Sequence, residues 1–416
     1  MVLVAGRGVA TELEEIRIDT ASLIVGMFVS RLDRPWVGTP FPLQGFEVRT
    51  EGELRTLRQL CKYVYIDRQR EIGHGRHPLL TLTPGEGSDK RFMRVTTYAN
   101  TVSIEEEMPR AREALRETSE LLDRIYADVT SGRELSVEQV EKVVRPLVAS
   151  VLRSADAFLF LEGMRRHDDY IYGHAIACGA LAAAFGRHLG LLEGSILSLA
   201  TAGLLMDIGK TRLPAELLRS AEPLSPAQIE LVRTHVEHGL DIVKAGGVKD
   251  PDVLDALRTH HERHDGSGYP DGLLDDTIPM AGRMLAIIDS YDAMCSARPY
   301  QAPVSRHAAL QAIYRARGVL YQTELVEQFQ VCLGVYPTGS RVELSTGEVA
   351  VVLEQNQVRR LRPTVLVVST PDKQPLQEFR VFDLLGQTVD GNTVEIRHTL
   401  AVDQYPIDTA GYLANV

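Results

Sequence analysis

Hydrophobic and polar residues alternate in the first part of the chain. The segments IRID, MFVSRL and YVYID, which lie between residues 16 and 67, have the two-residue period of strands, and glycines and prolines separate them. One stretch among them, EGELRTLRQLCKY, instead has the spacing of an amphipathic helix. We therefore predict a small α+β accessory module over residues 1–72.

Apolar residues recur at three- and four-residue spacing through the middle of the chain. Examples are MPRAREALRETSELLDRIYADV, LSVEQVEKVVRPLVASVLRSADAFLF and HAIACGALAAAFGRHLG. In LSPAQIELVRTHV, Ser225 is a suitable N-cap and Pro226 a suitable first helical residue. We predict an all-α domain over 104–334, joined to the first module by a linker over 73–103, where HGRHP and LTPGEGSDK show little periodicity.

Alternation returns after residue 335. The segments RVELSTGEVAVVLEQ, TVLVVST, FRVFDL and NTVEIR have strand character, and Thr346-Gly347 is a candidate hairpin turn. These residues predict a small β-rich module over 335–416. The expected fold class is mainly α, with a small module at each end.

Composition limits the classes of function. Lys and Arg number 45 and Asp and Glu 56, and the resulting net charge of −11 argues against binding of duplex nucleic acid. The longest apolar run, 175–185, is far shorter than the roughly 20 residues that span a bilayer. The four cysteines are widely spaced, which fits reduced cytosolic thiols. We expect a cytoplasmic protein without a membrane span.

Histidines are concentrated in the helical domain. Eight of the 12 lie between His167 and His264, where even spreading would put about three. Imidazole and carboxylate donors without thiolate favour iron, manganese, nickel or zinc in a catalytic site. With two aspartates present, two ions can be held if one carboxylate bridges them. The candidate ligands are His174, Asp207, His235, His260, His261 and Asp289.

Several of these residues also have a simpler interpretation. Asp207 can merely end a helix, with Gly209 as C-cap and Lys210 near the helix dipole. The DGSGYPDG segment can be only a tight turn. The adjacent pair His260-His261 is harder to explain structurally, because neighbours on a helix point about 100° apart. Isolated histidines are most simply surface or capping residues, namely His188, His238 and His307.

The segment HHERHDGSGYPDG resembles the HHE-x-x-DG-x-GYP motif of the HD-GYP domain family. The similarity extends over about 165–320 and includes YIYGH, LLMDIGK, HVEHG, IPMAGRMLAIIDSYDAM and SARPY in the family's order. The N-terminal LIVGMFVSRLDRPWVGTPFPLQGF is similar to a domain often found ahead of HD-GYP domains, and YPTGSRVELSTGEVAVV resembles the family's C-terminal extension. The resemblance implies an all-helical HD-superfamily fold and a phosphodiesterase that hydrolyses cyclic di-GMP to pGpG or GMP in bacterial signalling.

The resemblance also implies roles for individual residues. The six candidate ligands match metal ligands, with Asp207 bridging two ions that produce a hydroxide for in-line attack. Lys210, which is also assigned a catalytic role, and Arg298 match the cations that meet substrate phosphates. The loop residues Gly266, Gly268, Tyr269 and Pro270 match the GYP segment, which contacts substrate and serves recognition of GGDEF-type or other signalling proteins. Two divalent ions are expected, with iron or manganese preferred and nickel or zinc as alternatives. A homodimer is compatible with the resemblance.

Three positions depart from the family pattern. Met206 replaces the histidine of the HD pair, and a thioether is a weak donor for hard divalent ions. Gln301 stands where a basic residue is expected, and Tyr170 where some members carry a glutamate that supports a third metal. A binuclear centre with reduced activity is therefore the expectation.

Two further functions compete with the enzyme. A degenerate domain that binds nucleotide or a signalling partner without turnover is favoured by Met206 and Gln301, whereas retention of the other ligands favours catalysis. An HD-type phosphohydrolase acting on another substrate is a weaker alternative, because the GYP loop indicates the cyclic dinucleotide subgroup.

Overall fold

The structure is a computed structural model. It describes residues 15–23, 27–34, 46–48, 51–67, 96–164, 170–220, 222–296, 302–356, 359–389, 391–401 and 404–405. The chain forms two compact units, one of Met1–Glu86 with Asn356–Leu361 and one of Gly87–Gln355 with Arg362–Val416.

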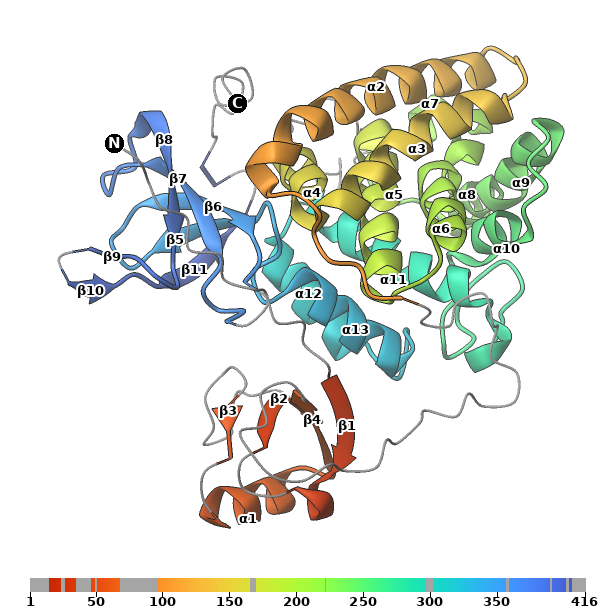
Figure 1. Ribbon diagram of the computed structural model, residues 1–416. Helices are drawn as coiled ribbons and strands as arrows, with labels where there is room; N and C mark the ends of the chain where they lie inside the picture. The colour runs from red at the N-terminus through yellow and green to blue at the C-terminus, as the bar shows by residue number, and fades with distance from the viewer. Residues whose placement is uncertain are drawn as a thin grey trace. The chain divides into compact units, whose positions relative to one another are not determined.

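The first unit contains the predicted α+β module (Figure 1). Its antiparallel sheet has the order β1-β4-β2-β3, built from β1 (Glu15–Asp19), β2 (Phe28–Leu32), β3 (Phe46–Glu47) and β4 (Tyr63–Asp67), with helix α1 (Glu51–Leu60) between β3 and β4. Alternate residues of β4, Val64 and Ile66, are buried in its small core. The predicted strands and helix of this module are thus confirmed.

The second unit contains the helical domain. Its α-helices are α2 (Ile104–Thr130), α3 (Val137–Arg153), α4 (Ala155–Met164), α5 (Tyr170–His188), α6 (Glu193–Leu205), α7 (Ala215–Leu218), α8 (Pro226–Arg233), α9 (His235–Ala245), α10 (Pro251–Thr259), α11 (Met280–Cys295), α12 (Arg306–Arg315) and α13 (Thr323–Leu333). Ser225 caps α8 and Pro226 is its first residue, as predicted. The run 135–160 is not one helix, because Ser154 adopts an extended conformation between α3 and α4.

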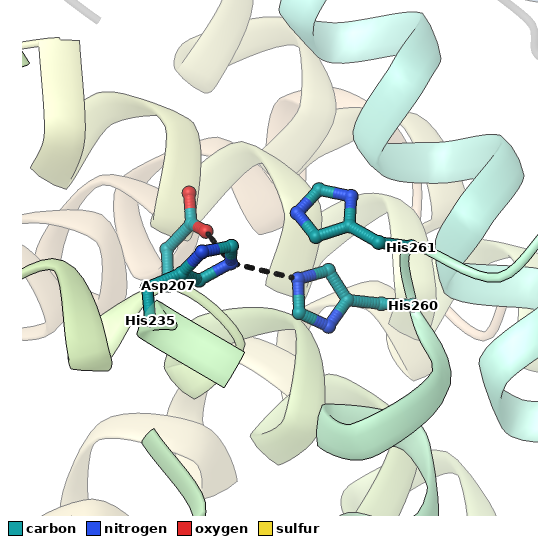
Figure 2. A group of neighbouring side chains, drawn as sticks. All are labelled: Asp207, His235, His260 and His261. Carbon is teal, nitrogen blue, oxygen red and sulfur yellow. Dashed lines mark hydrogen bonds and ion pairs between the residues drawn. The ribbon is translucent and has the colours of Figure 1, made fainter. Parts of the chain in front are cut away.

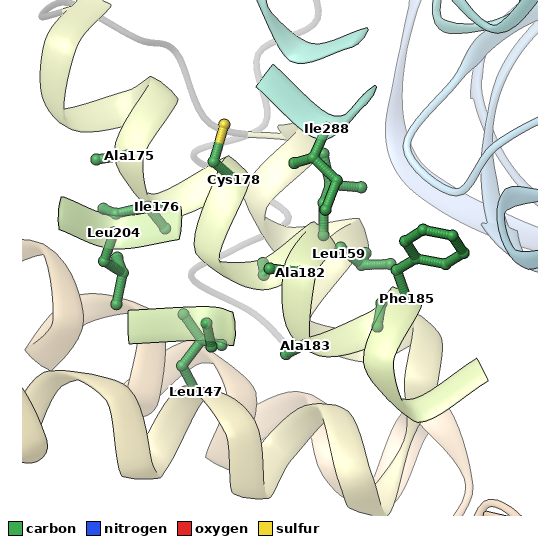
Figure 3. Packing of buried hydrophobic residues seen from close by; sticks show 14 of the residues in the cluster. Leu147, Leu159, Ala175, Ile176, Cys178, Ala182, Ala183, Phe185, Leu204 and Ile288 are labelled. Atoms are coloured by element: carbon green, nitrogen blue, oxygen red, sulfur yellow. The ribbon is translucent and has the colours of Figure 1, made fainter. Parts of the chain in front are cut away.

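The core of this domain lies around α5, which is apolar on every side. Side chains from α3, α4, α6 and α11 pack on it, including Leu147, Leu159, Leu204 and Ile288 (Figure 3). Helices α5 and α6 approach closely at Gly203, where an added Cβ would lie 2.9 Å from the carbonyl oxygen of Cys178. This close packing holds the start of α5 and the end of α6 in a fixed relation.

The C-terminal part of the second unit is a five-stranded antiparallel sheet of order β11-β5-β6-β7-β8. Its strands are β5 (Arg341–Leu344), β6 (Val349–Glu354), β7 (Thr364–Ser369), β8 (Pro375–Asp383) and β11 (Ile396–Leu400), and a two-stranded ribbon of β9 (Thr388–Val389) and β10 (Asn392–Thr393) adjoins it in sequence. The predicted turn between β5 and β6 is confirmed, with Gly347 at φ 89°. Val351 and Leu353 belong to the helical core, while Val342 and Val352 face a separate cluster.

Helix length and polarity argue against a membrane span in the described chain. None of the helices among the described residues combines the length and apolar character that crossing a bilayer requires.

Candidate metal centre

The predicted ligands come from the ends of four helices and from the middle of a fifth. His174 lies in the second turn of α5, Asp207 follows α6, and His235 is the first residue of α9. His260 caps the C-terminus of α10, which places it and His261 at the point where the helix ends. Asp289 lies within α11.

A close approach of two backbones brings Asp207 to His235. Gly209 lies in the 3-10 helix η4 (Ile208–Arg212), and an added Cβ there would be 1.9 Å from the carbonyl oxygen of His235 and 2.4 Å from the amide nitrogen of Gly239. Real Cβ contacts are never this short, so only glycine fits. The simpler interpretation of Gly209 as a helix C-cap is wrong, because the C-cap of α6 is Met206 and Gly209 lies within η4.

Four of the predicted ligands converge in space (Figure 2). Donor atoms of Asp207, His235, His260 and His261 all lie within 4.8 Å of one another. His235 Nε2 is 3.5 Å from Asp207 Oδ1 and 3.5 Å from His260 Nε2. The rings of the adjacent pair His260-His261 have centroids 4.1 Å apart. Both neighbours do reach one cluster at the helix end.

The hydrogen bonds of His235 and His260 turn two nitrogen lone pairs toward each other, as cation binding requires. His235 Nδ1 donates to the carbonyl oxygen of Val232 at 2.7 Å, and His260 Nδ1 donates to that of Leu257 at 2.8 Å. Since a carbonyl only accepts, each neutral ring carries its proton on Nδ1 and a lone pair on Nε2. Two lone pairs then face each other across 3.5 Å. A metal ion between them resolves this repulsion.

Burial keeps these imidazoles in the metal-binding form. It lowers the pKa of His235 to about 4, against the attraction of Asp207. The pKa values of His260 and His261 are also lowered by burial. All three rings are therefore neutral at pH 7, as metal ligation requires.

The two candidate carboxylate ligands stay ionised although they are buried. Burial raises the pKa of Asp207, but Lys210 and His235 outweigh it and hold that pKa well below its usual range. Lys210 Nζ donates to Asp207 Oδ2 at 2.5 Å. For Asp289, the hydrogen bond and charge of His174 likewise outweigh burial and lower its pKa. Negative charge thus persists where a cation would bind.

Asp289 and His174 form the other side of the cluster. His174 Nε2 lies 3.1 Å from Asp289 Oδ1 and 3.7 Å from Asp207 Oδ2. Asp289 Oδ2 is also 3.7 Å from His261 Nδ1. The structure therefore brings all six predicted ligands into one neighbourhood.

Asp292 is a functional residue that the sequence analysis missed. Its Oδ2 accepts from His174 Nδ1 at 2.7 Å, which fixes the ring and leaves Nε2 facing the cluster. The signal was its spacing, because a residue three positions after Asp289 on α11 shares a helix face with it. Cys178 Sγ lies 3.7 Å from the same Nδ1, but burial raises the pKa of its thiol to about 12, so it stays protonated.

Glu262 was also missed, and it organises the GYP loop. Its buried carboxylate accepts the backbone N–H groups of residues 271, 272 and 273 at 2.7, 3.1 and 3.0 Å. Gly268 packs against it so closely that an added Cβ would be 2.4 Å from Glu262 Cα. Nothing in the sequence alone indicates this capture of three successive amides. Tyr269, Gly266 and Pro270 thereby occupy a loop anchored beside the cluster.

Other predicted positions contribute less or cannot be placed. Met206 is 1% exposed and belongs to the hydrophobic core. Arg298 and Gln301 lie outside the described residues, as does the side chain of Tyr170. Among the described candidate donors, the isolated histidines His188, His238 and His307 are not part of the group around Asp207.

Two family models match the chain. The HD domain family matches residues 157–325, and the "Domain of unknown function (DUF3391)" matches residues 15–140. The first match spans every candidate ligand, and the second spans the α+β module. Phosphodiesterases with an HD domain depend on metal ions, and the histidine and aspartate donors described above fit such ions.

Named relatives extend this result. A cyclic di-GMP phosphodiesterase of Pseudomonas aeruginosa is 32% identical over 381 residues, which cover 89% of this chain and 90% of that protein. A cyclic di-GMP phosphodiesterase of Thermotoga maritima is 35% identical over 157 residues, 38% of this chain and 43% of that protein. A 3'3'-cGAMP-specific phosphodiesterase of Vibrio cholerae is 32% identical over 154 residues, 37% of this chain and 29% of that protein. Because the first of these matches spans nearly the whole of both proteins, the chain belongs to the HD-GYP family of HD-domain phosphodiesterases.

Proposed function

We propose that this chain is a metal-dependent phosphodiesterase that hydrolyses cyclic di-GMP to pGpG or GMP. The observation that carries the proposal is the pair of Nε2 atoms of His235 and His260 that face each other beside an ionised Asp207. Named relatives of the chain are cyclic di-GMP phosphodiesterases, which supports the choice of substrate.

The six ligands would hold two divalent ions, with Asp207 between them. Its two oxygens face different partners, since Oδ1 is near His235 and Oδ2 is near His174. Carboxylate and imidazole donors suit iron or manganese, and also nickel or zinc. When bound, such ions supply a hydroxide nucleophile near neutral pH and offset negative charge on the phosphate.

Other residues of the chain would prepare this site. Lys210, whose side chain is 19% exposed, sustains the charge of Asp207 and would offer its ammonium group to a substrate phosphate. Asp292 holds the ring of His174, and Glu262 holds the loop that carries Tyr269. Arg298 and the GYP loop residues Gly266, Gly268, Tyr269 and Pro270 are proposed to contact the substrate. The same loop is proposed to recognise signalling partners of the GGDEF type, and the chain to act in the cytoplasm.

Met206 favours a second candidate function, binding without turnover. Its side chain lies in the hydrophobic core, and the imidazole that the family pattern expects there is absent. In a protein that binds cyclic di-GMP without cleaving it, the metal-ligating residues would serve binding and not turnover. Turnover therefore has to be measured directly.

The deciding experiment uses protein purified without oxygen. Metal content is measured first, and cyclic di-GMP and 3'3'-cGAMP are then offered separately, with products resolved by chromatography. Release of pGpG or GMP that stops on chelation supports the proposal. Binding of cyclic di-GMP without product, at two ions per chain, would instead establish the second function.

A further inference from the structure

Tyr269 connects the candidate ligand His261 to a surface cation. The Tyr269 ring stacks on the His261 ring, with centroids 4.6 Å apart and 28° between the planes. The guanidinium carbon of Arg233 lies 4.8 Å from the Tyr269 ring centroid. The backbone N–H of Tyr269 also donates to the carbonyl oxygen of His261 at 3.2 Å. Arg233 is thus linked to the metal centre through one aromatic ring.

The position of Arg233 in the sequence also places it beside the metal centre. Arg233 is the last residue of α8, and His235 is the first of α9. The His235 ring donates back to Val232, the residue before Arg233. Two independent segments, the end of α8 and the GYP loop, therefore hold this guanidinium near the cluster.

Two other arginines near the loop, Arg258 and Arg263, form hydrogen bonds that hold the fold. Arg258 forms two hydrogen bonds with Asp271, at 2.7 and 2.8 Å. Arg263 donates to backbone carbonyl oxygens, at 2.9 Å for that of Glu262. These cations fix the loop and its approach to α10.

Arg233 forms a solvent-exposed ion pair with a neighbour on its own helix. Its Nη1 lies 2.7 Å from Glu230 Oε1, with the two side chains 42% and 67% exposed. Exposed pairs of this kind contribute about 0–1 kcal/mol, so an anionic ligand can displace Glu230 at little cost.

A cyclic dinucleotide needs such a cation. It carries two phosphates and only one is cleaved at a time, so the other phosphate keeps its negative charge and needs a cationic partner of its own. A planar guanidinium binds phosphate through two parallel hydrogen bonds, and a ring beneath it limits its motion. We propose that Arg233, supported by Tyr269, binds the substrate phosphate that is not being cleaved, an inference that rests on the proposed function.

The test compares substrates with two phosphates and with one. For Arg233→Gln, we expect the KM for cyclic di-GMP to rise about tenfold or more with a smaller change in kcat. The loss on bis(p-nitrophenyl) phosphate, which has one phosphate, should be clearly smaller. Arg233→Lys keeps the charge without the planar fork and should fall between parent and Arg233→Gln. Equal losses on both substrates would overturn the proposal, because they would mean that Arg233 supports the metal centre.

Controls separate this inference from the proposed function. Arg124→Gln removes an arginine of α2 that is 67% exposed and should leave both activities unchanged. Thermal unfolding midpoints of all variants should agree. If the parent does not hydrolyse cyclic di-GMP, calorimetric titration with cyclic di-GMP still tests Arg233, and its Kd should rise about tenfold in Arg233→Gln. Equal affinities, or no binding by the parent, would overturn the inference.

Discussion

The second unit contains two groups of buried or half-buried acids, and their pKa values shift in opposite directions. At the metal centre, Lys210 and the imidazoles hold the pKa of Asp207 well below its usual range despite burial. Where α4 meets the C-terminal sheet, burial raises the pKa of Asp156, and burial with the charges of Asp156 and Glu105 raises that of Glu354 to about 7.

The partners around each group explain the difference. Asp156 accepts from the Thr338 hydroxyl at 2.5 Å and from the backbone N–H of Gln355 at 3.3 Å, which are neutral donors. Asp207 has an ammonium group at 2.5 Å. The charge of Arg187 lowers the pKa of Asp156 but does not outweigh burial, whereas Lys210 and His235 do outweigh burial at Asp207. Burial alone does not mark a functional acid.

The largest expected effect is that of Asp207→Ala. Loss of this carboxylate removes a donor shared by both sides of the cluster, so turnover should fall at least about a thousandfold, equivalent to about 4 kcal/mol. Metal content per chain should fall with it. Asp241→Ala is the control, since Asp241 is 68% exposed on α9. Retention of two ions in Asp207→Ala would disprove the bridging role.

Gly209→Ala tests whether backbone packing maintains the centre. The added Cβ overlaps the carbonyl oxygen of His235, so the free energy of unfolding in urea should fall by about 2–3 kcal/mol. Manganese affinity should also fall, because Asp207 is displaced from His235. Gly194→Ala, where nothing lies within 4 Å of the new Cβ, should not destabilise. Equal unfolding free energies and equal manganese affinities in the two variants would show that the close approach of Gly209 to His235 is not required.

Glu354→Gln sharpens the contrast at the junction with the sheet. Because the folded pKa of Glu354, about 7, lies above the ordinary value of 4.5 for a glutamate, its ionisation reduces stability as pH rises from about 4.5 through 7. Glu354→Gln should therefore stabilise the protein at pH 8, by on the order of 1 kcal/mol after allowance for partial exposure, and have little effect at pH 4.5. Urea unfolding at both pH values measures this, with exposed Glu378→Gln as control. Destabilisation at pH 8 would refute the raised pKa.

Met206→His should have the smallest effect. It restores the nitrogen donor that the family pattern expects beside Asp207, so metal affinity and turnover should rise several-fold. Rates are compared with iron, manganese and nickel. If none of the three ions supports faster hydrolysis than in the parent, Met206 is not what limits activity.

Short-range pattern predicted most of the fold and the grouping of the candidate ligands. Alternation identified the strands of both sheets except the two-residue β3, and the motif order singled out six candidate ligands that the structure brings together. The break at Ser154 was not predictable, since apolar spacing continues through it. Contacts such as Asp156 with Thr338 join residues 182 positions apart and follow from packing that local pattern does not encode. The role of Glu262 could not be predicted for the same reason, because its hydrogen bonds depend on the conformation of the loop over residues 271–273.

Hydrolysis of cyclic di-GMP by metal-loaded protein, measured before and after chelation, tests the central claim most directly. The arrangement of His235, His260 and Asp207 around a cation predicts that pGpG or GMP forms, that chelation stops its formation, and that manganese or iron restores it. The Asp207→Ala variant should not recover. Failure of protein carrying two ions per chain to release product, or product formation that chelation does not affect, would contradict the account.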